Sequence, residues 1–573
     1  MTVATSDAGR PGSPSHDAGY DASHYAAKQA EPWWKRATGY QVYPRSFADS
    51  NGDGIGDIPG IISKLDHLAD LGIGFVWLSP VYASPMVDNG YDISDYRDIA
   101  PEFGTLADMD ALIAEAKARR IGIVMDLVVN HSSSEHDWFK RARASRSAPE
   151  HDYYIWRDAG PDGGPPDDQR ACFGGPAWTW VEGIGQYYFH YFSPAQPDLN
   201  WQNPALRAEV YDMMRWWLDC GIAGFRMDVI SLIGKDIDAR VYEEGPDLHR
   251  FLQEMHHEVL AGRDIVTIGE SWSVSLETGL LYCGRERKEL DMVFEFSHIQ
   301  EGWHPEHGKF APKPFDLAGF KRVLFSWQEL TRHDGWNSLF LTNHDLPRQV
   351  SFYGDDTVYR RDAARMLATI MHLLKGTPFV YQGEEIGMTN VTFTRIDQYR
   401  DLDTLNHFKE QMAFGVPAEQ FMAGANRNGR DNSRTPMQWT AGEMAGFTTG
   451  TPWIEVNPNA ESINVEADRV HPESILAHYR KLIALRRDHD VIALGTTEPL
   501  LLDDPAIVAY QRRWGGDRLF VLANFTAEAQ KVTLPDHVLG AGACLICSHE
   551  ERPTIEGKMM LAPYESFACF ITD

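Results

Sequence analysis

GIVMDLVVNH, residues 122–131, is the segment from which the architecture of this chain can be worked out. Its apolar run predicts a strand, and that run ends in Asp126, Asn130 and His131. The preceding residues, 105–120, place apolar side chains on one face at helical spacing and begin with Thr105 and Asp108, which resemble a capping box. We therefore expect a helix and then a strand whose end carries polar side chains.

The same alternation of amphipathic helices and short apolar runs extends from about residue 38 to residue 487. Eight segments are interpreted as strands: Gly39–Phe47, Gly74–Pro80, Gly122–His131, Gly224–Ile230, Asp264–Glu270, Met292–Phe296, Ser338–Asp345 and Pro378–Glu384. Eight strands, each followed by a helix or an insertion, predict an α/β fold of the (β/α)8 TIM-barrel type.

Three segments depart from a minimal barrel. Residues 131–200 are aromatic and rich in Gly and Pro, which predicts a small inserted domain after the third strand, and residues 386–453 predict a long excursion after the eighth. Beyond residue 488, short strands separated by turn signals predict a C-terminal antiparallel β-sandwich. We thus expect a disordered tail (1–30), a barrel (31–130 and 201–488), an inserted domain (131–200) and a β-sandwich (489–573).

The composition narrows the class of protein. The chain has 573 residues, 43% of them hydrophobic, and a formal net charge of −29, so we expect neither a nucleic-acid partner nor an anionic membrane surface. It has no apolar run of the length that spans a bilayer, and its N-terminus lacks the features of a secretory signal. Six cysteines, including the CxxC of Cys544 and Cys547, form neither a disulfide framework nor a metal motif. These features favour a cytoplasmic enzyme, which we expect to be a monomer.

Charged and polar side chains end four of the expected strands. They are Asp126 and His131, Arg226 and Asp228, Glu270, and His344 and Asp345. A single strand-end Asp often caps the next helix. Because the active sites of such barrels lie at the carboxyl ends of the strands, four such ends together predict one site.

Glycoside hydrolysis is the chemistry that needs this set. Its oxocarbenium-like transition state requires one ionised carboxylate below the sugar and one protonated carboxylic acid beside the leaving oxygen. We expect the neighbouring Arg to lower the pKa of the nucleophile, and repulsion among the carboxylates to raise the pKa of the acid. A His would hold the sugar hydroxyls in register.

Short motifs extend this interpretation to a family. DLVVNH, GFRMDVI, IGE and NHD resemble the four signature regions of the α-amylase superfamily of retaining glycosidases. QPDLNW, residues 196–201, resembles a fifth region of its oligo-1,6-glucosidase branch. GESW, ELDMVFEF, DGWNSLF, NHDLPR, YQGEEIGMTN and GRDNSRTPMQW are similar to those of bacterial dextran glucosidases (glucan 1,6-α-glucosidases). The likeness runs from about residue 33 to the end.

The resemblance implies a role for each matching residue. Asp228 becomes the nucleophile, Glu270 the general acid/base, and Asp345 the carboxylate that binds the 2- and 3-hydroxyls. His131, Arg226 and His344 match residues of the −1 subsite; Asp88, Tyr91 and Arg430 match those that hold the non-reducing end; Phe173 and Phe192 match aromatic walls. Core packing is the alternative role for the two phenylalanines. A pocket closed beyond −1 implies an exo-acting enzyme.

Two positions bear on the linkage. Val229, directly after the nucleophile, resembles the residue of α-1,6-specific members. Asp403 stands where dextran glucosidases are expected to carry a Glu that contacts the +1 sugar, so the chain departs from the pattern by one methylene. Lys309 is interpreted as a solvated surface side chain rather than a +1 contact.

The resemblance implies an exo-acting retaining α-glucosidase. It would hydrolyse terminal α-1,6 bonds of isomalto-oligosaccharides and dextran-derived chains through a covalent glucosyl-enzyme, with transfer to a second sugar at high sugar concentration. A sucrose-directed α-glucosidase or sucrose isomerase of the same superfamily is the alternative. A non-catalytic, transporter-associated heavy chain of the same fold would lose the catalytic carboxylates and carry a membrane span, unlike this sequence.

A loop after the first strand predicts a metal site. Oxygen donors recur at every second residue, as in an EF-hand, in Asp49, Asn51, Asp53, the carbonyl of Ile55, and Asp57. Its twelfth position is Gly60 rather than Glu, so the loop is not a true EF-hand. Because similar loops in this branch bind Ca²⁺, we expect one structural Ca²⁺ and no organic cofactor. A solvated acidic turn is the alternative.

Overall fold

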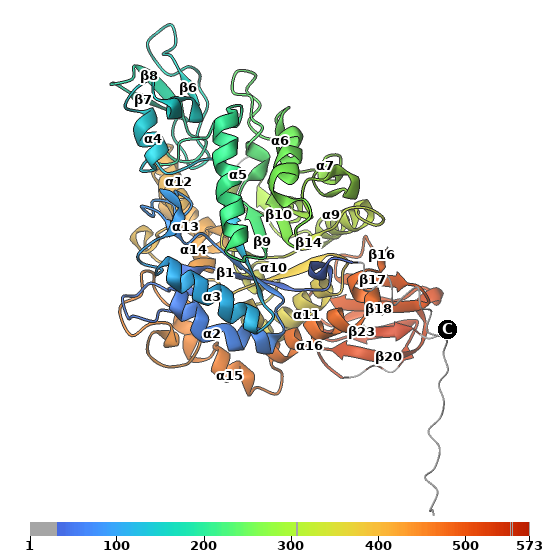
Figure 1. Ribbon diagram of the computed structural model, residues 1–573. Coiled ribbons are helices and arrows are strands. Elements are labelled where there is room, and N and C mark those ends of the chain that lie inside the picture. Colours follow the sequence, from blue (N-terminus) through green and yellow to red (C-terminus); the bar gives the residue numbers. More distant parts are fainter. Residues whose placement is uncertain (1–30, 305–307, 551, 553, 572–573) are drawn as a thin grey trace, which may run out of the picture.

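The computed structural model describes residues 31–304, 308–550, 552 and 554–571, so the tail predicted at residues 1–30 lies outside the described residues. Its central sheet is fully parallel, in the order β11-β10-β9-β5-β2-β1-β15-β14 (Figure 1). The strands are β1 (Gly39–Val42), β2 (Phe75–Leu78), β5 (Gly122–Leu127), β9 (Gly224–Met227), β10 (Val266–Glu270), β11 (Met292–Phe294), β14 (Ser338–Leu339) and β15 (Thr377–Tyr381). A parallel bridge between Val293 and Asn337 joins the two end strands. This confirms the expected barrel, with strands shorter than predicted.

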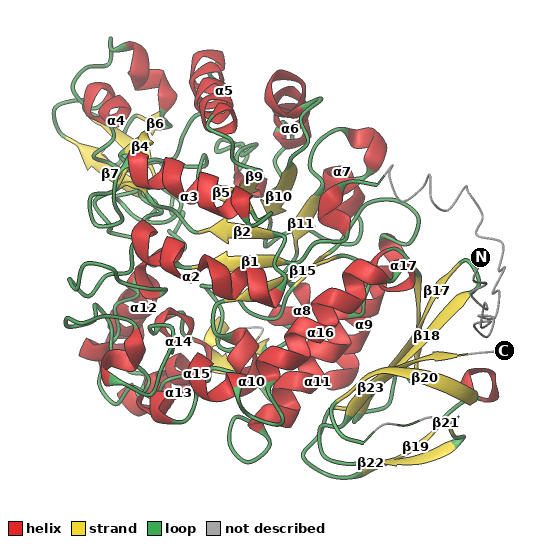
Figure 2. Cartoon of the chain, turned by 60° about the horizontal axis from the view of Figure 1, so that its bottom comes forward, coloured by secondary structure: helices red, strands yellow, loops and turns green. Residues whose placement is uncertain are grey.

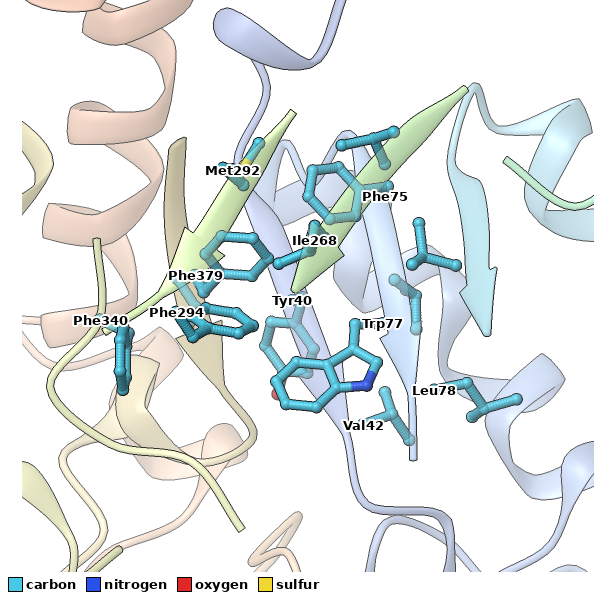
Figure 3. Packing of buried hydrophobic residues seen from close by; sticks show 14 of the residues in the cluster. Tyr40, Val42, Phe75, Trp77, Leu78, Ile268, Met292, Phe294, Phe340 and Phe379 are labelled. Atoms are coloured by element: carbon cyan, nitrogen blue, oxygen red, sulfur yellow. The ribbon is translucent and has the colours of Figure 1, made fainter. Parts of the chain in front are cut away.

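Aromatic side chains fill the barrel interior (Figure 3). The ring of Phe294 lies 4.7 Å from that of Phe379, 4.9 Å from Phe340 and 5.4 Å from Trp77, measured between centroids. Phe75 closes the cluster against Phe379 at 5.6 Å. The barrel is therefore a packed core, and a ligand can enter only at an end of its strands.

Amphipathic helices cover the outside of the barrel. They include α2 (Ile58–Leu71), α3 (Leu106–Ala118), α5 (Pro204–Asp219), α6 (Leu248–Met255), α9 (Leu317–Leu330), α11 (Arg360–His372) and α16 (Ile475–Asp488). The predicted capping box of α3 is present: the Thr105 N–H donates to Asp108 Oδ2 at 2.8 Å, and the Asp108 N–H donates to Thr105 Oγ1 at 3.3 Å. Among the described residues, no helix is long and apolar enough to cross a membrane.

Two segments rise over the carboxyl ends of the strands. The first, between β5 and α5, contains α4 (Asp137–Ala142) and an antiparallel sheet of β6 (Trp156–Arg157), β8 (Gln186–Phe189) and β7 (Trp178–Val181), seen at the upper left of Figure 1. The second follows β15 and contains α12 (Leu402–Ala413), α13 (Ala418–Asn428) and α14 (Asp431–Arg434). They meet where Glu410 Oε1 of α12 accepts from Arg170 Nη2 at 2.5 Å and from the Gly175 N–H at 2.8 Å.

The C-terminal domain is antiparallel throughout (Figure 2). Its larger sheet has the order β16-β17-β18-β23-β20-β21, and β19 pairs with β22 in a smaller one. The strands are β16 (Thr496–Leu500), β17 (Ile507–Trp514), β18 (Asp517–Asn524), β19 (Gln530–Thr533), β20 (Gly540–Cys547), β21 (Thr554–Ile555), β22 (Lys558–Leu561) and β23 (Ser566–Ile571). The sequence predicts strands at residues 500–502, 507–512, 519–524, 531–534 and 566–571, which overlap β16, β17, β18, β19 and β23 but leave β20, β21 and β22 unpredicted. GAGAC of β20 and KMML of β22 are poor in β-branched and aromatic residues.

Candidate active site

A cavity of about 420 Å³ opens at the carboxyl ends of the barrel strands. Ten of the twelve predicted catalytic and substrate-binding residues line it: Asp88, Tyr91, His131, Phe173, Phe192, Asp228, Glu270, Asp345, Asp403 and Arg430. The other two, Arg226 and His344, are buried behind the lining, where they contact it directly. The structure thus brings together side chains that are up to 342 residues apart in the chain, from Asp88 to Arg430.

Arg226, on β9, joins three carboxylates. Its Nη1 donates to Asp126 Oδ1 and to Asp228 Oδ1, each at 2.8 Å, and its Nη2 pairs with Glu270 Oε2 at 2.7 Å. The guanidinium lies 4.7 Å above the centre of the Trp77 ring, which fixes its plane against the barrel core. The expected nucleophile and the expected acid therefore bind the two ends of one guanidinium.

Because one guanidinium is shared among three carboxylates, the pKa of Asp228 is shifted in a different direction from the one expected. Burial, followed by repulsion from Glu270 and Asp126, raises the pKa of Asp228, and Arg226 only partly opposes this. Burial also raises the pKa of Asp126 to about 6. Arg226 thus lowers the pKa of Asp228, as the sequence argument expected, but burial and the neighbouring carboxylates outweigh its effect.

Glu270, at the end of β10, has two further donors. The Val229 N–H donates to its Oε2 at 3.0 Å, and Trp272 Nε1 donates to its Oε1 at 3.2 Å. Val229 adopts a left-handed conformation (φ 35°, ψ 45°), which is strained for a β-branched residue. Trp272 stacks on Phe296 with the ring centres 3.7 Å apart. The strained backbone and the stacked indole together hold the acid/base carboxyl in one place.

Asp345 is held ionised by cations from the α14 segment. Its Oδ1 accepts from Arg434 Nη2 at 2.9 Å and from Arg430 Nη1 at 3.1 Å, while His344 Nε2 lies 3.3 Å from its Oδ2. His344 and these guanidinium groups lower the pKa of Asp345 well below its usual range, despite burial. A permanently charged carboxylate suits a side chain that accepts hydrogen bonds from sugar hydroxyls.

Asp88, Arg430 and Phe173 form a buried end of the cavity, where each is no more than 7% exposed. Arg430 Nη2 lies 3.6 Å from Asp88 Oδ1 and 2.7 Å from Asp401 Oδ1, and its guanidinium lies 4.8 Å above the Phe173 ring. Burial raises the pKa of Asp88 to about 7, although Arg430 opposes the shift. Phe173 is thus a wall of the cavity, as is Phe192, whose ring centre lies 5.3 Å away.

Two histidines at the cavity, His131 and His344, are neutral at ordinary pH. Burial lowers the pKa of His131 to about 4 and that of His344 to about 3. The His344 ring stacks on Tyr91 with centres 5.3 Å apart and planes 7° apart, and its Nδ1 lies 2.8 Å from Gln41 Nε2. Neutral rings held in this way can donate hydrogen bonds to a sugar without adding charge.

Asp403, Lys309 and His407 form the open end. Lys309 Nζ is hydrogen-bonded to Asp403, and His407 Nδ1 lies 2.8 Å from Asp403 Oδ1. These two partners lower the pKa of Asp403 well below its usual range, despite its burial. The interpretation of Lys309 as a solvated surface side chain was therefore wrong, because it lines the cavity and pairs with a buried carboxylate.

Sequence reasoning missed several side chains of this site. Arg434, which binds Asp345, lies one helical turn after Arg430, and that spacing was a usable signal. Trp272 lies two residues after Glu270 in a strand-end motif, where its position also indicated the cavity. Lys309 and His407 lie in segments with no strand-end signal, on the hairpin of β12 (Trp303–His304) and β13 (Gly308–Pro312) and on α12. Only the fold brings them to the cavity.

The predicted metal loop forms a ladder of Asx turns. Asp49 Oδ1 accepts from the Asn51 and Gly52 N–H groups at 2.9 and 2.8 Å, and Asn51 Oδ1 accepts from the Asp53 N–H at 2.8 Å. Asp57 Oδ1 accepts from the Gly60 N–H at 2.6 Å and so caps α2. The donor set consists only of oxygen atoms, which fits a hard cation. Within the described ranges, no group of three or more His, Cys, Asp or Glu side chains converges closely enough to hold a metal ion.

Comparison with known families and proteins gives consistent matches. Residues 41–495 match the family model described as alpha amylase, catalytic domain, and residues 507–567 match the Alpha-amylase SusG C-terminal domain. The chain is 52% identical to Palatinase of Erwinia rhapontici, covering 95% of this chain and 99% of the relative. It is 50% identical to Oligo-1,6-glucosidase of Halalkalibacterium halodurans (93% and 98% covered) and 49% identical to Glucan 1,6-alpha-glucosidase of Streptococcus pneumoniae (94% and 99% covered).

Solved structures agree with the fold. Trehalose-6-phosphate hydrolase of Bacillus licheniformis superimposes with a TM-score of 0.90 at 44% identity, over 95% of this chain and 100% of the other. Isomaltulose synthase of Protaminobacter rubrum superimposes with a TM-score of 0.92 at 39% identity, with the same coverage. Enzymes of different names thus share this architecture.

Proposed function

Because this chain belongs to the α-amylase family, we propose that it is an exo-acting retaining α-glucosidase that hydrolyses terminal α-1,6 bonds of isomalto-oligosaccharides and dextran-derived chains. One observation carries the proposal: Asp228 and Glu270 bind opposite ends of the Arg226 guanidinium in the wall of a cavity that is closed at one end. Two carboxyl groups this close suit double displacement at one sugar.

The reaction follows from the positions of these groups. Asp228 attacks the anomeric carbon while Glu270 protonates the departing glycosidic oxygen, and a covalent glucosyl-enzyme results. Glu270, now ionised, takes a proton from water, which displaces Asp228 and releases α-glucose. The Val229 N–H and the Trp272 indole stabilise Glu270 in this ionised state. A second sugar in place of water gives transglucosylation.

The closed end accounts for exo-action. Asp88 and Phe173 both contact Arg430, and all three are no more than 7% exposed, from which we infer that they exclude a further sugar beyond the terminal one; their polar groups can bind its free hydroxyls. At the open end, the Lys309–Asp403 pair and Trp303 line the space that a leaving sugar would occupy. Lys309 is already paired with Asp403, which argues against a phosphorylated leaving sugar.

A substrate panel tests this proposal. Isomaltose, isomaltotriose, panose, maltose, sucrose, isomaltulose and trehalose 6-phosphate are incubated with the protein, and NMR records the released glucose and its anomer. We expect α-glucose to appear fastest from the 1,6-linked sugars. Faster consumption of sucrose, by hydrolysis or by isomerisation, would replace the substrate assignment with the sucrose-directed alternative, and β-glucose as the first product would refute retention.

We also propose that the loop of Asp49, Asn51, Asp53, Ile55 and Asp57 binds one structural Ca²⁺. Support comes from its all-oxygen donor set and the regular turns that present it. Ion analysis and thermal unfolding with and without a chelator test this. Bound calcium and a lower unfolding temperature after chelation are expected; no calcium and an unchanged temperature would refute the proposal.

We propose further that the enzyme is a cytoplasmic monomer acting on small oligosaccharides. Six cysteines in 573 residues form no disulfide framework in the sequence, which suits a reducing compartment. Light scattering after gel filtration, together with cell fractionation, tests both parts. A stable dimer, or recovery outside the cytoplasm, would refute the corresponding part.

A further inference from the structure

A buried chain of polar side chains connects Lys235 to the cavity. Lys235 Nζ donates to Asn130 Oδ1 at 2.6 Å and pairs with Asp198 Oδ2 at 2.9 Å. Asn130 Nδ2 lies 3.0 Å from His131 Nδ1, and His131 Nε2 lies 3.0 Å from the carbonyl oxygen of Tyr91. Lys235 is 7% exposed, and the Asn130, His131 and Asp198 side chains are more deeply buried, so water has little access to the hydrogen bonds between them.

This chain of hydrogen-bonded side chains permits only one arrangement of their hydrogen atoms. An ammonium group can only donate, so the Asn130 atom that faces it must be the carbonyl oxygen. The amide NH₂ of Asn130 then faces His131 Nδ1, which must accept. The ring proton is therefore on Nε2, from which it donates to the Tyr91 carbonyl. The opposite tautomer would place two donors against each other at one ring nitrogen and two lone pairs at the other.

Among the described residues, Gln196 alone makes a contact with the ring that would fit the opposite tautomer. Its Nε2 lies 3.3 Å from His131 Nε2. The same amide nitrogen donates to Asp88 Oδ2 at 3.0 Å and approaches the Tyr91 carbonyl oxygen at 3.4 Å, so it needs no lone pair from the ring. Two contacts of 3.0 Å therefore outweigh this longer one.

Burial keeps the His131 ring neutral, because the charged groups around it oppose each other. Asp198 raises and Lys235 lowers the pKa of His131, so these two neighbours oppose each other, and burial dominates. Asp88 is separated from the ring by the Gln196 amide. The remaining packing partner on this side, Phe192, carries no charge and lies 5.2 Å away between ring centres.

We propose that Lys235 and Asn130 are positioning residues that fix His131 as the neutral Nε2–H tautomer. The ring then offers the closed end of the cavity a single donor. A sugar hydroxyl placed there shares the Nε2 proton with the Tyr91 carbonyl in a bifurcated hydrogen bond and donates its own proton toward Asp88, which sets the direction of the hydrogen-bond chain. This use of the donor rests on the proposed function; the tautomer itself does not.

Nitrogen NMR of the full-length protein labelled with [¹⁵N]histidine tests the tautomer directly. The His131 signals are identified by their loss in His131→Gln. We expect an unprotonated Nδ1 and a protonated Nε2 that do not change between about pH 5.5 and pH 8, since a pKa near 4 lies below this range. A proton on Nδ1 in the unaltered protein would overturn the proposal, whatever the variants do.

Asn130→Asp tests whether the hydrogen-bonded side chains fix the tautomer, because a carboxylate facing His131 Nδ1 stabilises a proton on that nitrogen. We expect the His131 nitrogen shifts to exchange or the ring to become doubly protonated near neutral pH. At pH 8, kcat/KM should fall by about tenfold, the worth of one hydrogen bond. Activity should recover in part at lower pH, where the doubly protonated ring donates again. Unchanged shifts together with an unchanged pH profile would overturn the proposal.

Lys235→Met removes the ammonium and frees Asn130 to turn, so we expect signals from both His131 tautomers. Lys321→Met is the matched control, because Lys321 is also a buried lysine that donates to oxygen atoms, but it lies on α9, at the interface with the C-terminal domain. It should leave the His131 signals and kcat/KM unchanged. A single, unaltered tautomer in Lys235→Met would overturn the role of Lys235. The expected tautomer in a protein inactive on every glucoside would refute the proposed function alone.

Discussion

Asp228 carries the bond-forming step, so its removal gives the most direct prediction. Asp228→Asn keeps the shape and the contact with Arg226 but cannot form the glucosyl ester. We expect kcat on isomaltose to fall by about ten-thousandfold or more. Circular dichroism and thermal unfolding should show a folded protein. Turnover within about tenfold of the unaltered enzyme would contradict the assignment of the nucleophile.

The pKa of Asp88 predicts a pH dependence of binding rather than of chemistry. Burial raises this pKa to about 7, so the carboxyl is ionised above pH 7 and becomes neutral below it. The neutral form is the weaker acceptor for sugar hydroxyls, so KM should rise as the pH falls through about 7, by up to about tenfold. His131 and His344, with pKa values of about 4 and about 3, do not titrate in this range. His407 does, because its hydrogen bond to Asp403 raises its pKa despite burial, so any pH dependence that it contributes should persist when Asp88 is replaced.

Kinetics on isomaltose from pH 5.5 to pH 9 check this, with KM and kcat separated. Asp88→Asn should raise KM at pH 8 and remove the part of its pH dependence that Asp88 contributes, which we expect to be the larger part, because the amide does not titrate. A KM that is independent of pH in the unaltered enzyme, or that remains equally pH-dependent in the variant, would show that another group controls binding.

Strand-end residues could be predicted from the sequence, whereas residues delivered by the fold could not. Asp228, Glu270 and Asp345 follow apolar runs, and the carboxyl ends of barrel strands must meet. His407 contacts Asp403 one helical turn away on α12, but Lys309 reaches Asp403 from the β12–β13 hairpin, a contact between distant segments that no local pattern encodes. The direction in which the pKa of Asp228 shifts also escaped prediction, because it depends on one guanidinium shared by three carboxylates rather than on any single pair.

The contact between α12 and the inserted segment holds the Phe173 wall in place. Glu410 accepts from the Gly175 N–H at 2.8 Å, and Asn406 Nδ2 donates to the Phe173 carbonyl at 3.1 Å. The Arg170 side chain is 61% exposed, so its ion pair with Glu410 adds little stability. The hydrogen bond to the backbone should therefore matter more than the charge.

Substitution of Glu410 separates the two contributions. Glu410→Gln keeps an acceptor for the Gly175 N–H and should change KM by less than about twofold. Glu410→Ala loses the acceptor, loosens the loop that carries Phe173, and should raise KM on isomaltose by about threefold to tenfold with kcat nearly unchanged. Equal effects of the two variants on KM would contradict this account, because the charge of Glu410, rather than its hydrogen bond to the Gly175 N–H, would then hold the loop in place.

Element boundaries were predictable to the extent that a local pattern fixes them. Thr105 and Asp108 gave the start of α3, because both side chains bond to the backbone of the first turn. β20 and β22 escaped because their stability comes from neighbouring strands rather than from their own residues: Cys544 pairs with Cys569 of β23, and Val532 of β19 pairs with Met559. The excursion after β15 was recognised only as a long segment, since its helices pack on other loops.

The barrel and the C-terminal domain share a buried polar interface. Lys321 Nζ of α9 donates to the carbonyl oxygens of Leu501, Asp504 and Ile507 at 2.7, 2.6 and 2.8 Å. The Tyr510 hydroxyl donates to the Ile370 carbonyl of α11 at 2.8 Å. Because buried carbonyls without donors are unfavourable, each domain supplies partners that the other lacks. The two should therefore unfold together.

Lys321→Met tests this coupling, because it keeps the aliphatic stem and removes the donor to three carbonyls. We expect the free energy of unfolding to fall by about 2–4 kcal/mol, since the carbonyls lose their partner in a buried site. Calorimetry should show one transition at a lower temperature, with kcat/KM at 25 °C unchanged, because neither Lys321 nor the three residues that it binds line the cavity. A second transition, with activity surviving the first, would instead show that the barrel is stable without the C-terminal domain.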